Sequence, residues 1–197
     1  MANPTNSFRP GRLDLFEQLL RLFSTGRMVD LGTGHGRFAI RAADLGWDAT
    51  GVDARNERWP DDQRVTWVQE DVRTHDLDNY DVIACLGLFY HLTCEDQLSF
   101  LARAAGRPVI LDTHLDHGEH KHKVTRRLTQ GDGYEGVLYT EPGATTSSWE
   151  NASSFWPTLP SFQRMLAENG YGTVLTVDPW HAPDRTFFVA LPNPAAT

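Results

Sequence analysis

The chain has 197 residues, enough for one well-buried domain, whereas two domains would be cramped. Hydrophobic residues make up 40% and charged residues 22%, which is typical of a globular protein and argues against a disordered chain. The 26 acidic residues outnumber the 18 basic ones and give a net charge of −8, which disfavours a broad nucleic-acid-binding face. We therefore expect one domain over residues 1–197.

The sequence also indicates the compartment. Cys85 and Cys94 are the only cysteines and show no paired ligand spacing, which favours a reduced, cytoplasmic setting. No apolar run approaches the roughly 20 residues that a membrane helix requires. The first residues have neither the basic start nor the apolar core of a signal peptide. We expect no membrane partner, and we expect residues 192–197 to form a disordered tail.

The first predicted element is a helix. Apolar residues recur there at helical spacing and form a stripe suited to covering the face of a sheet. They are Leu13, Phe16, Leu20 and Phe23.

A glycine-rich turn follows the first predicted strand. The apolar run from Arg27 ends at Asp30, three glycines then alternate with other residues, and a helical pattern over 37–45 follows. Alternating glycines let a ligand approach the backbone, and the free N–H groups of the helix start add a partly positive end. A strand, a glycine turn and a helix together predict a mononucleotide-type cradle at the carboxyl edge of a parallel sheet.

The spacing of these glycines narrows the choice of ligand. Dinucleotide folds usually carry G-x-G-x-x-G, whereas the turn here is one residue shorter. With its preceding acid, the string VDLGTGHG resembles motif I of the class I S-adenosylmethionine-dependent methyltransferases. That resemblance implies S-adenosylmethionine as the cofactor. The residues that it assigns to cofactor binding are Asp30, Gly32, Thr33, Gly34 and Gly36.

A second acidic residue ends the strand predicted over 49–53. Asp53 follows the glycine turn at about the separation at which Rossmann-like folds place a carboxylate against ribose hydroxyls. A carboxylate can accept both hydroxyl protons at once. We therefore predict that Asp53 and the adjoining Ala54 bind the cofactor, with a solvated turn aspartate as the alternative.

A third acidic position follows the strand predicted over 65–69. In the methyltransferases that this chain resembles, an acidic residue after the third strand usually meets the adenine amino group. The resemblance assigns this role to Asp71, together with the backbone of Val72. The alternative is a helix-capping or loop aspartate.

The strand predicted over 80–86 runs directly into residues 87–92. This segment resembles motif IV of the same superfamily, whose backbone cups the sulfonium methyl group, so we also expect Leu86 at the cofactor. A helix over 95–104 and a strand over 108–113 follow. The last strand is apolar, as a central parallel strand should be.

The order of the elements predicts the fold. Five strand signals alternate with helices up to residue 113, which is the βαβ rhythm of a doubly wound sheet. A helix over 161–169 and two strands, 171–177 and 186–191, then follow. This final hairpin resembles the methyltransferase sheet. We therefore expect a Rossmann-like α/β fold of seven strands in the order 3-2-1-4-5-7-6, with the last strand antiparallel.

An insert over 114–160 separates the strand that ends near 113 from the late helix. Long segments at the carboxyl edge of such a sheet usually shape substrate pockets or lids. We therefore expect the insert to cover the substrate. Its candidate substrate-binding residues are Tyr134, Tyr139, Glu141, Trp149, Asn151 and Trp156.

Two histidines are candidates for catalysis. Methyl transfer is an in-line displacement, so holding donor and acceptor aligned can supply most of the acceleration. If the acceptor is a hydroxyl, a base at its proton helps, and histidine suits this role near neutral pH. His91 and His114 follow two predicted strands and are candidate bases, and Tyr90 is a candidate for orienting the acceptor. For each histidine the alternative is a hydrogen-bonded structural role.

Histidines also cluster between His114 and His122. In a helix, His117 and His120 would share a face, and neutral imidazoles bind zinc. However, Gly118 interrupts the segment, and its spacing matches no established ligand set. We therefore expect a solvated polar segment and no metal.

The resemblance implies a methyltransferase, which we expect to act on a small-molecule acceptor, with oxygen favoured because two histidines flank the expected pocket. Residues 87–91 also resemble a stretch of the tRNA wobble-uridine carboxymethyltransferases, so a tRNA-modifying alkyltransferase is the alternative. Those relatives are longer and carry basic RNA-binding extensions, which the length and charge of this chain do not fit. Further alternatives are a non-catalytic nucleotide-binding module and an NAD-type oxidoreductase. The oligomeric state has no signal in the sequence.

Overall fold

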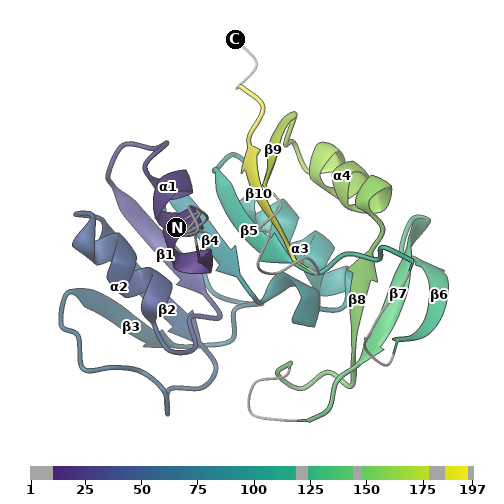
Figure 1. Cartoon of the computed structure of the whole chain (residues 1–197), viewed down its shortest axis with the longest axis horizontal. Helices are drawn as coiled ribbons and strands as arrows, with labels where there is room; N and C mark the ends of the chain where they lie inside the picture. Colours follow the sequence, from purple (N-terminus) through teal and green to yellow (C-terminus); the bar gives the residue numbers. More distant parts are fainter. Residues whose placement is uncertain (1–10, 119–123, 144–147, 178–184, 195–197) are drawn as a thin grey trace, which may run out of the picture.

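A computed structural model describes residues 11–118, 124–143, 148–177 and 185–194. Its main element is a seven-stranded sheet with the order β3-β2-β1-β4-β5-β10-β9 (Figure 1). The strands of this sheet are β1 (Arg27–Leu31), β2 (Asp48–Asp53), β3 (Val65–Gln69), β4 (Val82–Leu86), β5 (Val109–Thr113), β9 (Thr173–Val177) and β10 (Thr186–Leu191).

The strand directions agree with the prediction. β1 lies parallel to β2 and β4, β2 is parallel to β3, and β4 is parallel to β5. β10 is antiparallel to both of its neighbours, with Phe188 opposite Leu111 on β5 and Thr176 on β9. Within this sheet β9 is the sixth strand along the chain and β10 the seventh. The predicted order 3-2-1-4-5-7-6 with an antiparallel last strand is therefore confirmed.

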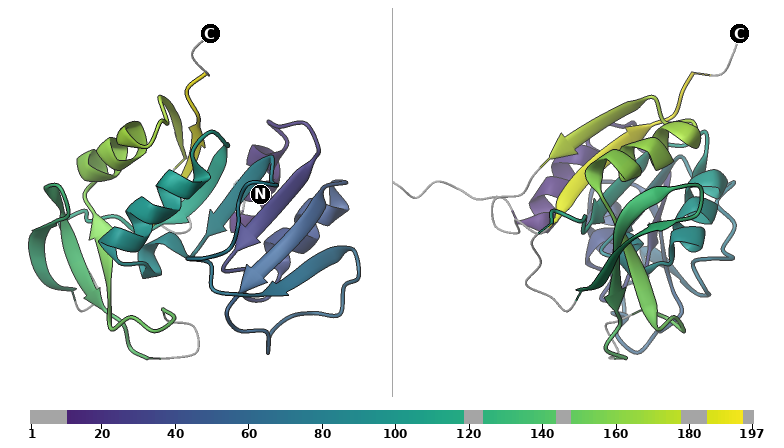
Figure 2. Two further views of the ribbon diagram at one scale, coloured as in Figure 1. Left: turned by 180° about the vertical axis from the view of Figure 1, so that it is seen from behind. Right: turned by 90° about the vertical axis from the view of Figure 1, so that its right-hand side faces the viewer.

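Helices cover both faces of the sheet, α1 and α2 on one face and α3 and α4 on the other (Figures 1 and 2). Alternate side chains of β4 enter the two cores, Ile83 beneath α3 and α4 and Ala84 beneath α1 and α2. Burial on both faces explains why β4 and β5 are continuous apolar runs in the sequence. The helices are α1 (Arg12–Leu20), α2 (Arg37–Asp44), α3 (Cys94–Ala104) and α4 (Leu159–Glu168).

The connections on either side of β3 depart from the predicted rhythm. Residues 54–64 and 70–81 contain no helix, whereas the sequence pattern predicts strands that alternate with helices. Trp59 of the first connection stacks on Trp67 of β3, with ring centroids 5.6 Å apart, and the Trp67 indole donates a hydrogen bond to the Asp62 carbonyl. This aromatic pair covers part of the face on which a helix would otherwise pack.

The insert forms a second sheet, which the sequence patterns do not predict. The sheet is antiparallel with β7 in the middle, and Figure 2 shows it at one end of the large sheet. The Phe155 amide donates to the Leu92 carbonyl at 3.0 Å, which ties the second sheet to the chain that follows β4. The elements of this region are the 3-10 turn η1 (Phe89–His91), β6 (Val124–Gln130), β7 (Tyr134–Thr140) and β8 (Ser153–Pro157).

The described end of the chain packs against the end of α4. The Asn193 amide donates a hydrogen bond to the Gly170 carbonyl at 2.7 Å. Of the tail predicted over residues 192–197, residues 192–194 are described, and residues 195–197 lie outside the described residues. In the part of the chain that the structure describes, no helix has the length and apolar character of a membrane span.

Candidate functional site

A pocket opens at the carboxyl ends of β1, β2 and β4. The space between its walls, counted together with the solvent at its mouth, is about 720 Å³. Loops of the large sheet form most of the wall, and the loop between β7 and β8 completes it. The lining residues are Gly32, Gly34, Asp53, Ala54, Arg55, Arg58, Asp71, Val72, Gly87, Leu88, Tyr90, His91, Ser148 and Trp149.

The glycine turn after β1 forms one wall of the pocket. Gly32 and Gly34 have φ values of 69° and 52°, in the left-handed region that favours glycine. A Cβ on Gly32 would lie 3.0 Å from the Leu88 side chain, so glycine also lets two loops meet. The amides of Gly32 and Thr33 donate to the Val52 carbonyl at 2.8 and 3.1 Å. These bonds fix the turn to β2.

Asp53 lines the pocket at the end of β2. Its Oδ2 accepts a hydrogen bond from the Gly34 amide at 2.9 Å, and its Oδ1 accepts one from the Arg55 amide at 3.0 Å. Each carboxylate oxygen has two acceptor positions, so both oxygens can accept a further hydrogen bond. The side chain is therefore oriented by backbone donors and can still bind a pair of hydroxyls. Ala54 adjoins it in the pocket wall.

Asp71 lines the pocket after β3, next to Val72. The Arg73 amide donates to its Oδ1 at 2.9 Å, and the Arg73 guanidinium binds both carboxylate oxygens. These hydrogen bonds from Arg73 hold the pKa of Asp71 below its ordinary value. Asp71 is therefore a fixed, ionised acceptor at the edge of the pocket.

Four of the predicted cofactor residues lie behind the pocket wall. Asp30 is fully buried and accepts a hydrogen bond from the Thr33 hydroxyl at 2.7 Å, which supports the glycine turn from within. Burial raises the pKa of Asp30 to about 7. Gly36 lies against the Trp67 ring, where there is no room for a Cβ, and Leu86 belongs to the core. These residues shape the pocket without lining it.

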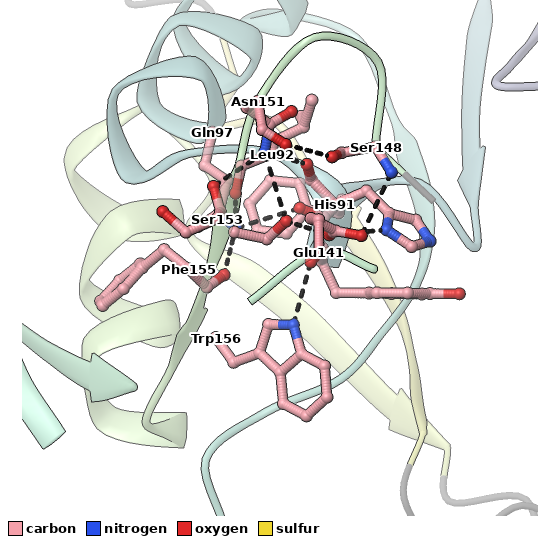
Figure 3. Close-up of polar contacts among 12 residues, drawn as sticks. His91, Leu92, Gln97, Glu141, Ser148, Asn151, Ser153, Phe155 and Trp156 are labelled. Atoms are coloured by element: carbon pink, nitrogen blue, oxygen red, sulfur yellow. Dashed lines mark hydrogen bonds and ion pairs between the residues drawn. The ribbon is translucent and has the colours of Figure 1, made fainter. Parts of the chain in front are cut away.

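His91 lines the pocket and pairs with a buried carboxylate (Figure 3). Its Nδ1 lies 2.9 Å from Oε1 of Glu141, whose side chain is 2% exposed. Ser154 donates its hydroxyl to the same oxygen, and the Ser148 amide donates to Oε2 at 3.2 Å. Burial acts to raise the pKa of Glu141, but the hydrogen bonds from His91 and Ser154 outweigh it and lower the pKa. Glu141, a predicted substrate residue, lies behind His91 and does not line the pocket.

The other candidate base, His114, does not line the pocket. Its ring stacks on Trp156, with centroids 4.7 Å apart, and Tyr139 stacks with Trp156 at 4.8 Å. The Tyr90 ring, which lines the pocket, meets the His114 ring edge to face, with centroids 4.4 Å apart. The Trp156 indole donates to the Tyr90 carbonyl at 2.9 Å. His114, Tyr139 and Trp156 therefore support Tyr90 from behind.

The remaining predicted substrate residues have different positions. Trp149 lines the pocket, and the Arg55 guanidinium lies 4.9 Å from its ring centroid. Asn151 donates its side-chain amide to the His91 carbonyl at 3.1 Å. Tyr134 lies on the far side of the insert, against α4. The guanidinium carbon of Arg164 on α4 lies 4.2 Å from the Tyr134 ring centroid. The structure therefore separates Tyr134 from the pocket.

The sequence patterns did not predict several charged residues at the site. Arg55 and Arg58 line the pocket, and Arg12 and Arg185 form ion pairs with the fully buried Asp112 of β5. One signal was available, because Asp112 is an acid in an otherwise apolar strand and a buried carboxylate needs a positive partner. Nothing in the sequence pattern identifies which arginines supply that partner.

The histidine cluster gives no metal site within the described residues. There, no three His, Cys, Asp or Glu side chains are grouped so that they could hold an ion. His117 is exposed, whereas His120 and His122 lie outside the described residues.

Several solved structures are similar to this chain. The N-terminal domain of EvdMO1 with S-adenosylhomocysteine bound has a TM-score of 0.72 at 20% identity, and the match covers 92% of this chain and 80% of that one. The glycopeptide N-methyltransferase MtfA complexed with S-adenosylmethionine has a TM-score of 0.62 at 15% identity, and the match covers 98% of this chain and 100% of that one. The Burkholderia thailandensis 1,6-didemethyltoxoflavin-N1-methyltransferase has a TM-score of 0.63 at 15% identity, and the match covers 92% of this chain and 78% of that one. At these identities the likeness establishes the fold.

The family is established by sequence. No curated protein matches the chain. The family model described as a methyltransferase domain matches residues 6–117, more than half of the 197 residues. The glycine turn, Asp53, Asp71 and His91 all lie within this matched region. The chain therefore belongs to the methyltransferase-domain family.

Proposed function

We propose that this protein is an S-adenosylmethionine-dependent methyltransferase that methylates a hydroxyl oxygen of a small-molecule acceptor. The observation that carries the proposal is the pairing of His91 with the buried Glu141 at the pocket wall. A candidate base and the predicted cofactor residues Asp53 and Asp71 then share one pocket.

The pocket residues fit this cofactor. Gly32 and Gly34 leave the backbone open to a ligand, and Asp53 keeps acceptor positions for two ribose hydroxyls. Asp71 and Val72 lie at the pocket edge for the adenine. When bound, S-adenosylmethionine supplies an electrophilic methyl group on its sulfonium. Similar structures contain S-adenosylmethionine or S-adenosylhomocysteine, which supports the same cofactor here.

His91 acts as the general base. Its Nδ1–H donates to Glu141, which leaves Nε2 to accept the proton of the acceptor hydroxyl. The ionised Glu141 then stabilises the imidazolium that forms. Ser154 and the Ser148 amide hold the carboxylate in place, so His91 is oriented before the acceptor binds. Tyr90, the neighbour of His91 on η1, orients the acceptor.

The charge of the chain favours a small acceptor over a nucleic acid. Its net charge of −8 disfavours RNA. Similar structures contain bound 1,6-didemethyltoxoflavin or were obtained in the presence of D-fucose, which supports this class of acceptor. A tRNA substrate of the wobble-uridine type is the alternative, and it requires tight, salt-sensitive tRNA binding.

Calorimetry and product release test the proposal. We expect S-adenosylhomocysteine to bind and NAD not to bind, whereas the reverse would indicate an oxidoreductase. Methyl transfer is then measured as S-adenosylhomocysteine release from S-adenosylmethionine with a panel of hydroxylated small molecules. Cofactor binding without release would indicate a non-catalytic module. Methyl incorporation into tRNA would establish the RNA alternative.

A further inference from the structure

A cluster of charged residues adjoins the pocket at the end of β5. Asp112, whose side chain is fully buried, accepts a hydrogen bond from Nε of Arg12 at the start of α1. Arg185, which directly precedes β10, approaches the same carboxylate with Nη1 at 3.4 Å from Oδ2. Residues from three distant parts of the chain therefore meet around one carboxylate.

Gly87 connects this cluster to the pocket. Its φ of 87° is in the left-handed region, and it lines the pocket. A Cβ at this position would lie 3.1 Å from Nη2 of Arg12 and 3.4 Å from Nη1 of Arg185. Glycine thus allows both guanidinium groups to approach the pocket wall.

Tyr90 makes the second connection. Its hydroxyl accepts a hydrogen bond from Nη2 of Arg185, and the Arg185 guanidinium lies 4.9 Å from the Tyr90 ring centroid. Tyr90 lines the pocket, and its ring lies 4.3 Å from that of His91. The cationic cluster is therefore next to the proposed base.

The charges of the cluster do not balance. Among the described residues, two guanidinium groups surround the Asp112 carboxylate. Asp30, whose charge also acts on Arg12, has a pKa of about 7 and is mostly neutral below that pH, which leaves an excess of positive charge there. One arginine would suffice to neutralise Asp112, so a purely structural role does not require both. The side chains of Arg12 and Arg185 are also 32% and 21% exposed, so solvent or a ligand can reach them. Guanidinium groups match carboxylate and phosphate oxygens in geometry as well as charge.

We propose that Arg12 and Arg185 bind a carboxylate or phosphate group of the methyl acceptor, so that the preferred substrate is a hydroxylated small-molecule anion. This inference rests on the proposed function of the pocket. An acceptor anion would neutralise the excess charge and bring the rest of the acceptor alongside Tyr90 and His91. The reacting hydroxyl would then lie close to the anionic group.

The test uses the full chain saturated with S-adenosylhomocysteine, and saturation is first confirmed by calorimetry. Three matched probe pairs are titrated at constant ionic strength: 4-hydroxybenzoate against 4-hydroxybenzamide, D-glucuronate against D-glucuronamide, and D-glucose 6-phosphate against D-glucose. We expect at least one anion to bind about tenfold to a hundredfold more tightly than its neutral partner, as charge-assisted hydrogen bonds would give. The first two pairs report on a carboxylate and the third on a phosphate.

Arg12→Gln and Arg185→Gln should each remove most of this preference. Either variant leaves Asp112 paired with the other arginine, so both should remain folded, which melting curves verify. Arg185→Lys keeps the positive charge but loses the planar guanidinium, which can donate two parallel hydrogen bonds. This variant should retain part of the preference. Arg21→Gln removes an exposed arginine at the C-terminal end of α1 that pairs with Glu17 and should leave the preference intact.

Three outcomes would overturn the inference while leaving the proposed function standing. One is a saturated protein that binds no anion better than its neutral partner. A second is a preference that survives in both glutamine variants. A third is a loss of S-adenosylhomocysteine affinity in those variants without any anion preference, which would assign the charge to the cofactor's own carboxylate. Failure of S-adenosylhomocysteine to bind at all would instead count against the proposed function.

Discussion

Three carboxylates of the site differ in charge because their partners differ. Arg73 lowers the pKa of Asp71, and hydrogen bonds from His91 and Ser154 lower that of Glu141. Full burial raises the pKa of Asp30 to about 7, because its hydrogen-bond donors, the Thr33 hydroxyl and the Ala39 backbone amide, are neutral and do not offset it. Asp71 and Glu141 are therefore ionised where the proposed chemistry uses their charge, whereas Asp30, the acid with the raised pKa, supports the glycine turn from within.

Asp53→Ala tests the proposed ribose contact. We expect the variant to bind S-adenosylhomocysteine about 1–3 kcal/mol more weakly, because charged hydrogen bonds to two hydroxyls would be lost. Calorimetry measures the change. Asp48→Ala is the matched control, since Asp48 is an exposed acid at the opposite end of β2 and should leave the affinity unchanged. Equal affinity in the Asp53 variant and the native protein would remove Asp53 from the cofactor site.

His91→Ala tests the proposed base. We expect kcat to fall by about 10²–10⁴-fold, the usual contribution of general base catalysis, while cofactor affinity is retained. Glu141→Gln should also lower kcat, because the imidazolium would lose its buried counter-charge. His114→Ala should keep turnover within a few fold, since that ring stacks outside the pocket. Product release with an accepted small molecule measures all three, and full turnover in His91→Ala would exclude His91 as the base.

Asp30→Asn tests the effect of the buried acid on stability. A carboxyl whose pKa is about 7 in the folded protein, against an ordinary value of 3.8, stabilises the fold below pH 4. That stabilisation is lost as pH rises through 7. Asparagine does not titrate, so its stability relative to the native protein should increase by about 1–3 kcal/mol between pH 5 and pH 8. Urea unfolding at several pH values measures this difference, and parallel curves for the two proteins would contradict a raised pKa.

Local motifs made part of the site predictable from sequence. The glycine turn, Asp53 and Asp71 lie at or just beyond the carboxyl ends of strands, so short-range patterns indicate their place at the pocket. The pairing of Glu141 with His91 joins residues 50 positions apart and depends on how the insert packs, so no local pattern could predict it. For the same reason the sequence suggested Tyr134 as a substrate residue, although it faces α4.

At the scale of elements, apolar runs and helical periodicity in the sequence predicted the large sheet but not the second sheet. Its strands mix polar and apolar residues, with aromatic residues on β7 and β8, and their pairing is set by packing beside η1. The Gln97 side chain of α3 is fully buried and makes the central connection (Figure 3). Its Nε2 donates to the carbonyl of Phe155 at 2.7 Å and to that of Phe89 at 3.0 Å. One side chain thus holds α3, η1 and β8 together.

Gln97→Met should therefore weaken the attachment of the second sheet. The methionine has a similar volume but cannot donate, so buried carbonyl oxygens would lose a partner. We expect the free energy of unfolding to fall by about 2–4 kcal/mol. Urea unfolding measures the loss, and Gln18→Met at an exposed position of α1 is the control. A stability within about 0.5 kcal/mol of the native protein would show that η1 and β8 do not depend on this residue.

At the scale of the whole molecule, the insert reaches back across the pocket to the opposite half of the large sheet. The Arg55 guanidinium donates to the Ser148 carbonyl at 3.4 Å and lies over the Trp149 ring, and Arg73 pairs with Glu150 at 3.4 Å. Glu150 has a φ of 63°, which is costly for a residue other than glycine and is held by the surrounding contacts. Residues 148–151 thus form a bridge over the proposed cofactor pocket.

Trp149→Ala should therefore speed the release of S-adenosylhomocysteine. The loss of its aromatic cover, worth about 1–2 kcal/mol, should raise the dissociation rate by about 5–30-fold. Association should change less, because substitutions at a binding surface act mainly on dissociation. Stopped-flow displacement measures both rates. The dissociation rate from Trp149→Phe should lie between that from the native protein and that from Trp149→Ala. Leu175→Ala, at a similarly exposed position on β9, is the control. If release from Trp149→Ala is as slow as from the native protein, the bridge does not retain the cofactor, and the insert serves the acceptor and the His91–Glu141 pair alone.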